Sequence, residues 1–229
     1  RRHIHLEPRV QRLQPAAASR RFPSYLAPAM TQLPELPLTL SRQEIRKMIR
    51  QRRRTLTPEQ QQEMGQQAAT RMMTYPPVVM AHTVAVFLSF DGELDTQPLI
   101  EQLWRAGKRV YLPVLHPFSA GNLLFLNYHP QSELVMNRLK IHEPKLDVRD
   151  VLPLSRLDVL ITPLVAFDEY GQRLGMGGGF YDRTLQNWQH YKTQPVGYAH
   201  DCQLVEKLPV EEWDIPLPAV VTPSKVWEW

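Results

Sequence analysis

The run Val84-Ala85-Val86-Phe87-Leu88 is apolar throughout, without the polar alternation of a strand that has one solvent-exposed face. Such runs are typical of strands buried on both faces. A helix is expected next, opened by Thr96 and Pro98 and ended by Gly107, and the run from Arg109 to Leu115 reads as another strand. Buried strands that alternate with helices predict an α/β fold of three layers, in which helices cover a mostly parallel sheet.

The rest of the chain continues this alternation. Further short strands are expected at 123–128, 159–162, 196–198 and 220–221, with a helix beginning near Phe180. Towards the amino terminus, Ser41 and Glu44 form a capping-box pattern that predicts a helix over 42–54. A second helix is predicted to start at Thr57 and to end before Pro76.

Composition excludes several classes of protein. No apolar run approaches the roughly 20 residues of a membrane-spanning helix, so we expect no membrane insertion. Cys202 is the only cysteine, which excludes an intramolecular disulfide and a thiolate zinc cluster within one chain, and favours the reducing cytoplasm. Residues 1–54 hold 13 Lys and Arg against 3 acidic residues, whereas residues 55–229 hold 14 against 20. The basic charge therefore belongs to one end of the chain and is weak evidence for nucleic-acid binding.

Two regions are expected. Residues 1–38 contain six prolines and no lasting apolar periodicity, which predicts a disordered basic leader. Its arginines would suit a mitochondrial transit peptide, but its prolines interrupt an amphipathic helix. Because the chain begins with Arg, and Met30 and Met48 are internal start candidates, we also consider the hypothesis that part of this leader is not native protein. Residues 39–229 are expected to form the α/β domain.

The most informative segment is a glycine loop, Gly171-Gln172-Arg173-Leu174-Gly175-Met176-Gly177-Gly178-Gly179-Phe180-Tyr181-Asp182-Arg183. Successive glycines allow positive φ angles, which turn neighbouring N–H groups towards one point, and such a nest before a helix binds phosphate. Asp182 could then hold a metal that bridges phosphate oxygens, and Arg173 could pair with the same oxygens. Neither a Walker loop nor a dinucleotide fingerprint is present. A tightly turned or flexible loop without a ligand is the structural alternative.

This loop, together with the preceding Leu164-Val165-Ala166-Phe167-Asp168, resembles the signature of the 5-formyltetrahydrofolate cyclo-ligase family. Other landmarks agree in order and spacing over residues 41–223: Arg42 and Arg46, Phe87-Leu88-Ser89 followed by Glu93, Pro163, and Pro209-Val210-Glu211. The resemblance implies an ATP- and Mg²⁺-dependent ligase that converts 5-formyltetrahydrofolate into 5,10-methenyltetrahydrofolate, with release of ADP and phosphate. It implies phosphorylation of the formyl oxygen, ring closure by N10, and a fold like that of sugar-phosphate isomerases and CoA transferases.

The resemblance also implies the roles of individual residues. Arg173 would be the catalytic residue that stabilises the moving phosphoryl group. The residues implied to contact ATP are Arg42, Arg46, Arg173, Leu174, Gly175, Met176, Gly177, Gly178, Gly179, Phe180 and Tyr181. Those implied to contact the folate are Leu88, Glu93, Met176, Gly177, Gly178, Gly179 and Phe180.

Acidic residues divide between two implied roles. Asp182 would be the magnesium ligand. Asp214 is a weaker candidate for a second ligand, and the alternative for this residue is an acid in a surface loop. Glu93 would accept hydrogen bonds from the pterin, with Asp91 and Asp95 as rival acids nearby.

Two alternatives remain open. One is an isomerase or transferase of the same fold, which would act on a phosphorylated or CoA substrate without using ATP. The other is a nucleic-acid-binding module that uses the basic amino-terminal segment. The glycine loop and the acidic body favour the enzyme, and we expect a monomer whose partners are small-molecule substrates.

Overall fold

The computed structural model describes residues 40–229, so the expected leader at 1–38 lies outside the described residues. Its main sheet consists of β1 (Thr83–Ala85), β2 (Arg109–Leu115), β3 (Leu123–Tyr128), β6 (Val151–Leu152), β7 (Val159–Thr162), β10 (Gln194–Tyr198), β12 (Ala219–Val221) and β13 (Val226–Glu228). The strand order is β13-β12-β10-β7-β1-β2-β3-β6. The five strands from β12 to β2 are parallel to one another, and β13, β3 and β6 are added at the two edges through antiparallel pairs. The predicted α/β class is confirmed.

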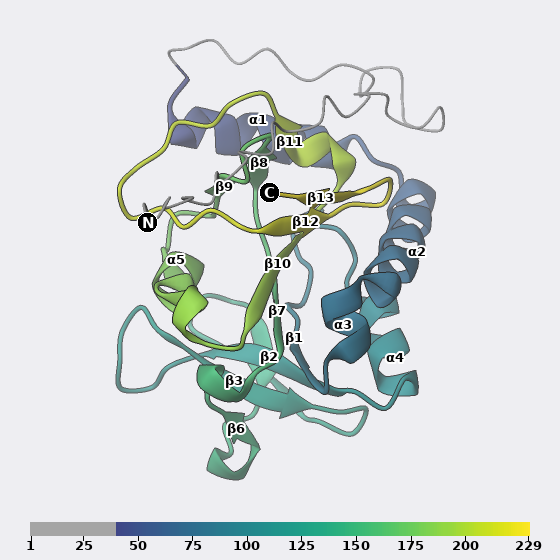
Figure 1. The fold of residues 1–229 in the computed structure, drawn as a ribbon, viewed down its shortest axis with the longest axis vertical. Helices are drawn as coiled ribbons and strands as arrows, with labels where there is room; N and C mark the ends of the chain where they lie inside the picture. The colour runs from purple at the N-terminus through teal and green to yellow at the C-terminus, as the bar shows by residue number, and fades with distance from the viewer. Residues whose placement is uncertain (1–39) are drawn as a thin grey trace, which may run out of the picture.

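Helices cover both faces of this sheet. The helices are α1 (Arg42–Arg54), α2 (Pro58–Thr74), α3 (Pro76–Met80), α4 (Gln97–Arg105) and α5 (Phe180–Leu185). Figure 1 shows α2, α3 and α4 together on one side of the strands, with α5 on the other side and α1 across one end. Under α1 lies a small sheet of order β11-β8-β9, formed by β11 (Leu204–Val205), β8 (Ala166–Asp168) and β9 (Arg173–Leu174).

The remaining elements are short. A hairpin of β4 (Leu134–Met136) and β5 (His142–Pro144) forms a separate two-stranded sheet in contact with β2 and β3. Single turns of 3₁₀ helix span Val148–Asp150, Leu154–Arg156, Trp188–His190 and Asp201–Gln203. No helix within residues 40–229 is both long enough and apolar enough to cross a membrane.

The apolar run from Val84 to Leu88, which begins within β1, shows how the layers pack. Val84 contacts the core formed with α2 and α4, and its neighbour Ala85 contacts the core on the opposite face. Both residues are fully buried, as a strand covered on both sides requires. The regular strand is shorter than expected and ends at Ala85, because the chain beyond Val86 leaves the sheet. The later part of the apolar run therefore becomes available to line a cavity.

Local signals fixed the first helix accurately. The Ser41 hydroxyl accepts a hydrogen bond from the Glu44 N–H at 3.1 Å, and the Ser41 N–H donates to the Glu44 carboxylate at 3.2 Å. This reciprocal cap starts α1 at the predicted residue. Ile45 and Ile49 are buried against the small sheet, so α1 is attached by its apolar stripe and leaves its arginines on other faces.

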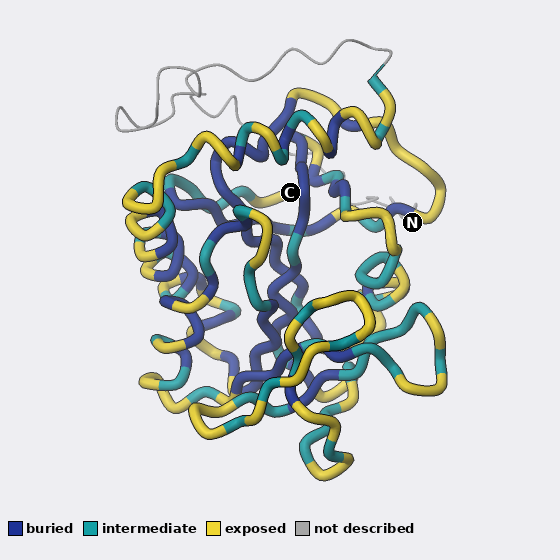
Figure 2. Tube along the Cα trace, turned by 180° about the vertical axis from the view of Figure 1, so that it is seen from behind, coloured by how far each residue is buried: buried dark blue, intermediate teal, exposed yellow. Residues whose placement is uncertain are grey.

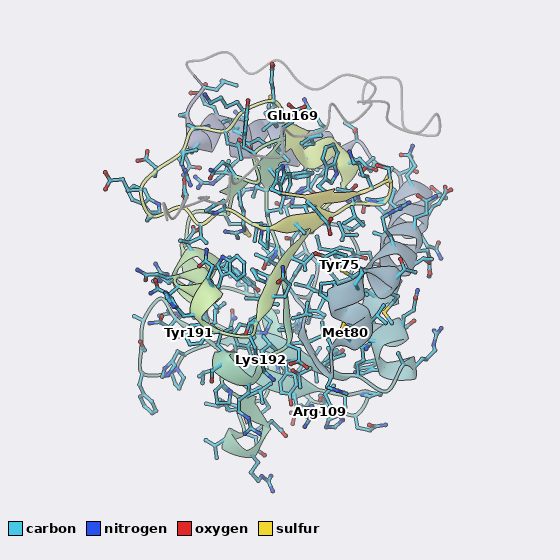
Figure 3. All side chains as sticks on the ribbon, viewed as in Figure 1. Tyr75, Met80, Arg109, Glu169, Tyr191 and Lys192 are labelled. Atoms are coloured by element: carbon cyan, nitrogen blue, oxygen red, sulfur yellow. The ribbon has the colours of Figure 1, made fainter. Side chains whose placement is uncertain are left out.

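The two ends of the parallel strands differ. Arg109 and Lys192, at or just before the amino ends of β2 and β10, lie at the lower end of the molecule in Figure 3, whereas Glu169 lies at the upper end near α1. Figure 2 shows buried residues concentrated along the central strands between these ends. The carboxyl ends of the strands thus face α1, and in open α/β sheets this is the end where ligands bind.

Candidate active site

A cavity of about 320 Å³ lies at the carboxyl ends of β1, β2 and β7. It brings together segments that are far apart in the sequence. Its lining consists of Arg42, Gln43, Arg46, Phe87, Leu88, Phe90, Glu93, Pro113, Leu115, Leu123, Asn137, Leu139, Ile141, Pro163, Leu164, Arg173, Gly175, Met176, Gly177, Gly178, Gly179, Phe180, Tyr181, Asp182 and Trp213. Among them are all the predicted site residues except Leu174 and the weaker metal candidate Asp214.

The glycine loop forms one wall. Gly177 has φ 110° and Gly179, the residue before α5, has φ 70°, both in the region that side chains disfavour. Within residues 40–229, the N–H groups of 176–180 donate no hydrogen bond to another residue. Unpaired N–H groups in a turn that leads into a helix are suited to an anion, so the loop has the donor pattern of a phosphate site.

Arg173 lies beneath this wall and is 6% exposed. Its Nε donates to the Pro163 carbonyl at 2.8 Å, and its guanidinium carbon lies 5.5 Å from the centre of the Tyr181 ring. Its Nη1 is 3.7 Å from an oxygen of Asp182. Burial lowers the pKa of Arg173 from its ordinary value. Because that value is far above neutrality, the side chain stays cationic and keeps a positive charge in the cavity.

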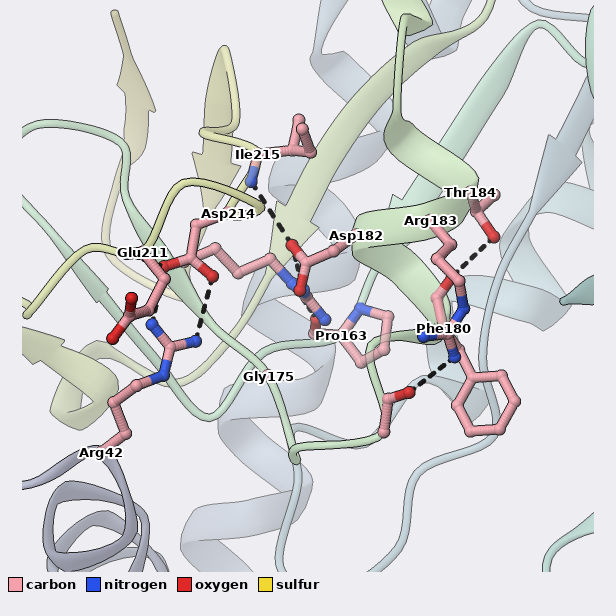
Figure 4. A network of polar contacts seen from close by, with 12 residues as sticks. Arg42, Pro163, Gly175, Phe180, Asp182, Arg183, Thr184, Glu211, Asp214 and Ile215 are labelled. Atoms are coloured by element: carbon pink, nitrogen blue, oxygen red, sulfur yellow. Dashed lines mark hydrogen bonds and ion pairs between the residues drawn. The ribbon is translucent and has the colours of Figure 1, made fainter. Parts of the chain in front are cut away.

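Arg46 and Arg42 come from the first turns of α1. The Nε of Arg46 donates to the Gly175 carbonyl at 2.7 Å, which ties the helix to the glycine loop. Burial, with the neighbouring charges of Arg42 and Arg50, lowers the pKa of Arg46. Arg42 instead donates twice to Asp214, at 2.6 and 3.0 Å, as Figure 4 shows. The two predicted phosphate contacts are thus both at the cavity, but Arg42 already has a carboxylate partner.

Asp214 is not the surface acid that we considered. Its side chain is only 3% exposed, and it accepts the Glu211 N–H as well as Arg42. It does not line the cavity, so its role in this structure is to orient Arg42.

Asp182 is at the cavity on the first turn of α5. One of its oxygens is near Arg173 and accepts a weak hydrogen bond from the Ile215 N–H at 3.4 Å (Figure 4). The described residues contain no group of three or more His, Cys, Asp or Glu side chains able to hold a metal. A single carboxylate beside a phosphate site still fits Mg²⁺, which takes one or two protein carboxylates and completes its shell with phosphate oxygens and water.

Glu93 stands on a second wall. Its carboxylate is nine-tenths buried and accepts the Phe90 N–H at 3.1 Å. Burial is the largest influence on this carboxyl and raises its pKa to about 7, although Phe90, Arg53 and Arg173 act in the opposite direction. Leu88 and Phe90 add apolar surface beside it. This wall can accept hydrogen bonds from a planar, apolar ring system that carries N–H donors.

The structure separates Glu93 from its two rivals. Asp91 makes ion pairs with arginines of α1, and Asp95 accepts the Gln97 N–H at the start of α4. Neither lines the cavity. Glu93 is therefore the acid of this segment that a ligand can reach.

Leu174 has a different position from the one implied. Its side chain is 1% exposed and packs in the cluster of Ile45, Ile49 and Val205. The side chain alternates with that of Arg173 along β9, so one residue faces the core under α1 and the other the cavity. Leu174 consequently offers no side-chain surface to a ligand.

Sequence reasoning missed the part of the wall that comes from other segments. Asn137, Leu139 and Ile141 belong to the tip of the β4–β5 hairpin, and Trp213 precedes Asp214 in a long loop. Nothing in the local sequence of these segments says which surface they approach. Cys202 takes no part: it is buried, and burial raises its pKa to about 12, which leaves no thiolate for catalysis.

Comparisons with known proteins identify the family of this chain. A model of the 5-formyltetrahydrofolate cyclo-ligase family matches residues 39–223. The 5-formyltetrahydrofolate cyclo-ligase of Haemophilus influenzae is 53% identical over 179 residues, which cover 78% of this chain and 96% of that protein. The protein of the same name from Mycolicibacterium smegmatis is 31% identical over 188 residues, which cover 81% and 95%.

Solved structures show the same architecture. The 5,10-methenyltetrahydrofolate synthetase of Aquifex aeolicus superposes with a TM-score of 0.71 at 28% identity, covering 82% of this chain and 93% of that chain. A 5,10-methenyltetrahydrofolate synthetase from Mycoplasma pneumoniae has a TM-score of 0.64 at 20% identity, covering 81% and 100%, and supports the fold alone. The chain belongs to the 5-formyltetrahydrofolate cyclo-ligase family.

Proposed function

We propose that this chain catalyses the ATP- and Mg²⁺-dependent conversion of 5-formyltetrahydrofolate into 5,10-methenyltetrahydrofolate, with ADP and phosphate as the other products. The observation that carries the proposal is the cavity itself. It joins a glycine loop with unpaired N–H groups, and buried arginines, to a carboxylate in an apolar wall, although Glu93 and Gly177 are 84 positions apart. A phosphate donor and a ring that carries N–H donors can therefore meet in one space.

The reaction explains why both walls are needed. The formyl oxygen attacks the γ-phosphorus of ATP, the bond to the bridging oxygen breaks, and ADP leaves. N10 then attacks the activated formyl carbon, loses its proton, and the carbon–oxygen bond breaks to release phosphate. Little covalent chemistry is asked of side chains, so positioning and charge stabilisation supply most of the rate.

We assign the residues to these tasks as follows. The N–H groups of the glycine loop and Arg46 would hold the triphosphate, and Arg173 would stabilise charge on the phosphoryl group in transfer. Glu93 would accept hydrogen bonds from the pterin between Leu88 and Phe90. Asp182 would hold Mg²⁺, which when bound neutralises charge on the phosphate oxygens. Arg42 would contribute positive charge while Asp214 keeps it in place.

An absorbance assay tests the proposal. 5,10-Methenyltetrahydrofolate absorbs in the near ultraviolet, and we expect its absorbance to rise only when 5-formyltetrahydrofolate, ATP and Mg²⁺ are all present. An isomerase or transferase of this fold would not produce it. No signal with all three present would refute the proposed activity.

Two further expectations belong to this proposal. We expect the protein to act as a monomer in the cytoplasm. Sedimentation at micromolar concentration and fractionation of the producing cells would test them, and a dimer or a membrane-associated pool would contradict them.

A further inference from the structure

Glu93 closes a tight turn whose conformation is unusual. The two central residues, Asp91 and Gly92, have φ angles of 51° and 74°, and the Glu93 N–H donates to the Phe90 carbonyl at 3.1 Å. Two consecutive left-handed residues define a type I′ turn. The Phe90 N–H donates in return to Glu93 Oε1 at 3.1 Å. The backbone of this turn therefore decides where the Glu93 carboxylate lies.

Asp91 has a left-handed backbone, which costs energy for any residue other than glycine. Its carboxylate faces three arginines from the last turns of α1. The distances are 3.6 Å to Arg50 Nε, 3.8 Å to Arg53 Nη2 and 3.2 Å to Arg54 Nη2. A single exposed pair contributes little, but several cations around one carboxylate hold it more firmly. The ion pairs thus bind the tip of the turn to α1.

Contacts with the backbone reinforce the attachment. The Arg53 side chain is only 3% exposed, and a Cβ added at Gly92 would lie 3.4 Å from the Arg53 Cβ. On the other side, Gln61 Nε2 donates to the Gly92 carbonyl at 3.2 Å. The turn consequently lies against the carboxyl end of α1, while Arg46 in the second turn of the same helix holds the glycine loop through Gly175. One helix supports both walls of the cavity.

We propose that Asp91 is a positioning residue for folate recognition: its ion pairs with Arg50, Arg53 and Arg54 hold the Phe90–Glu93 turn so that the Glu93 carboxylate faces the cavity. This inference rests on the proposed function and assigns Asp91 no contact with either substrate. It predicts that loss of the Asp91 charge affects the folate and leaves ATP binding as it was.

The decisive variant is Asp91→Asn, because Asn has the same shape and tolerates the left-handed region equally well. We expect the KM for 5-formyltetrahydrofolate to rise about three- to tenfold, with the KM for ATP and kcat within twofold of wild type. Asp95→Asn is the matched control. Asp95 makes no ion pair among the described residues, and Asn can replace its cap on Gln97, so both KM values should stay unchanged.

Arg54→Gln tests the same contact from the other partner. Arg54 is exposed and outside the cavity, so its loss should raise the folate KM by a smaller factor. In the double variant with Asp91→Asn the two effects should be less than additive, since both remove one interaction.

The outcomes separate the two proposals. An active wild type with an unchanged folate KM in Asp91→Asn would overturn the positioning role alone, and so would equal increases in both KM values with a lowered melting temperature. A wild type that forms no methenyl product would overturn the proposed function, and this inference with it.

Discussion

The two walls of the cavity are built in opposite ways. The glycine loop has unpaired N–H donors, and arginine side chains hold it by its carbonyls: Arg46 at Gly175, and Arg183 at Gly178 with a 2.6 Å hydrogen bond. The Phe90–Glu93 turn instead presents a buried carboxylate, and its backbone bonds and ion pairs fix it. One wall attracts negative charge and the other accepts hydrogen bonds, which suits two ligands of different chemistry.

Because the two walls differ in this way, the effects of substitutions on the two substrates should be separable in this site. Substitutions on the glycine wall should act mainly on ATP and on turnover, whereas substitutions on the Glu93 wall should act on the folate alone. Any variant that affects both substrates equally would break this division.

Arg173→Ala should have the largest effect. The residue lies under the glycine wall where phosphoryl charge would develop, so we expect kcat to fall by at least about 100-fold. Circular dichroism should show an intact fold. Arg109→Ala, at the opposite end of the sheet, is the control and should keep wild-type kcat. Turnover of Arg173→Ala near the wild-type rate would remove Arg173 from catalysis.

Glu93→Gln should raise the KM for 5-formyltetrahydrofolate by about 10- to 30-fold, because an amide cannot accept hydrogen bonds at both of its terminal atoms. The KM for ATP should change less than twofold. Steady-state kinetics with each substrate varied in turn would measure both values. If only the KM for ATP rose, the Glu93 carboxylate would belong to the nucleotide site and not to the folate site.

The same substitution should change stability with pH. The pKa of Glu93 is raised from 4.5 to about 7, so the folded state binds more protons than the unfolded state between these values. Wild-type stability therefore falls as pH rises through this window. Above pH 7, Glu93→Gln should be more stable than wild type by about 3 kcal/mol, and near pH 4.5 the difference should vanish. Urea unfolding at pH 4.5 and pH 8 measures this; a difference independent of pH would contradict it.

Gly177→Ala tests the glycine wall. A Cβ there would have space, with its nearest neighbour 3.7 Å away, but φ 110° is unfavourable for alanine and the N–H groups must turn. We expect the KM for ATP to rise about tenfold and the folate KM to rise by a smaller factor, because the same loop is implied to approach the folate. Gly107→Ala, also at positive φ but outside the cavity, should lose stability without any change in either KM. Equal KM values in the two variants would argue against the glycine loop as the nucleotide wall.

Much of the fold follows from local signals. The capping box at Ser41 starts α1, Gly107 with φ 75° follows the end of α4, and the apolar run of β2 spans the residues predicted. These features depend on neighbours in the chain, so physical rules about caps and turns are sufficient. The strand at 123–128 was also predicted. Its antiparallel pairing with β2 follows from a turn at Gly121, which the alternation of strands and helices along the chain does not reveal.

The sequence by itself determined the class of fold and the family, predicted the glycine loop as a phosphate site, and supplied the acids and arginines that a site could use. Only the tertiary structure showed that Glu93, and not Asp91 or Asp95, lines the cavity. It also placed the Leu174 side chain in the core and paired Arg42 with Asp214. The physical reason is that hydrogen-bonding pattern and propensity are local, whereas burial and charge pairing depend on which distant segments meet. Asp214 acquires its partner 172 positions away, a distance over which no periodicity in the sequence extends.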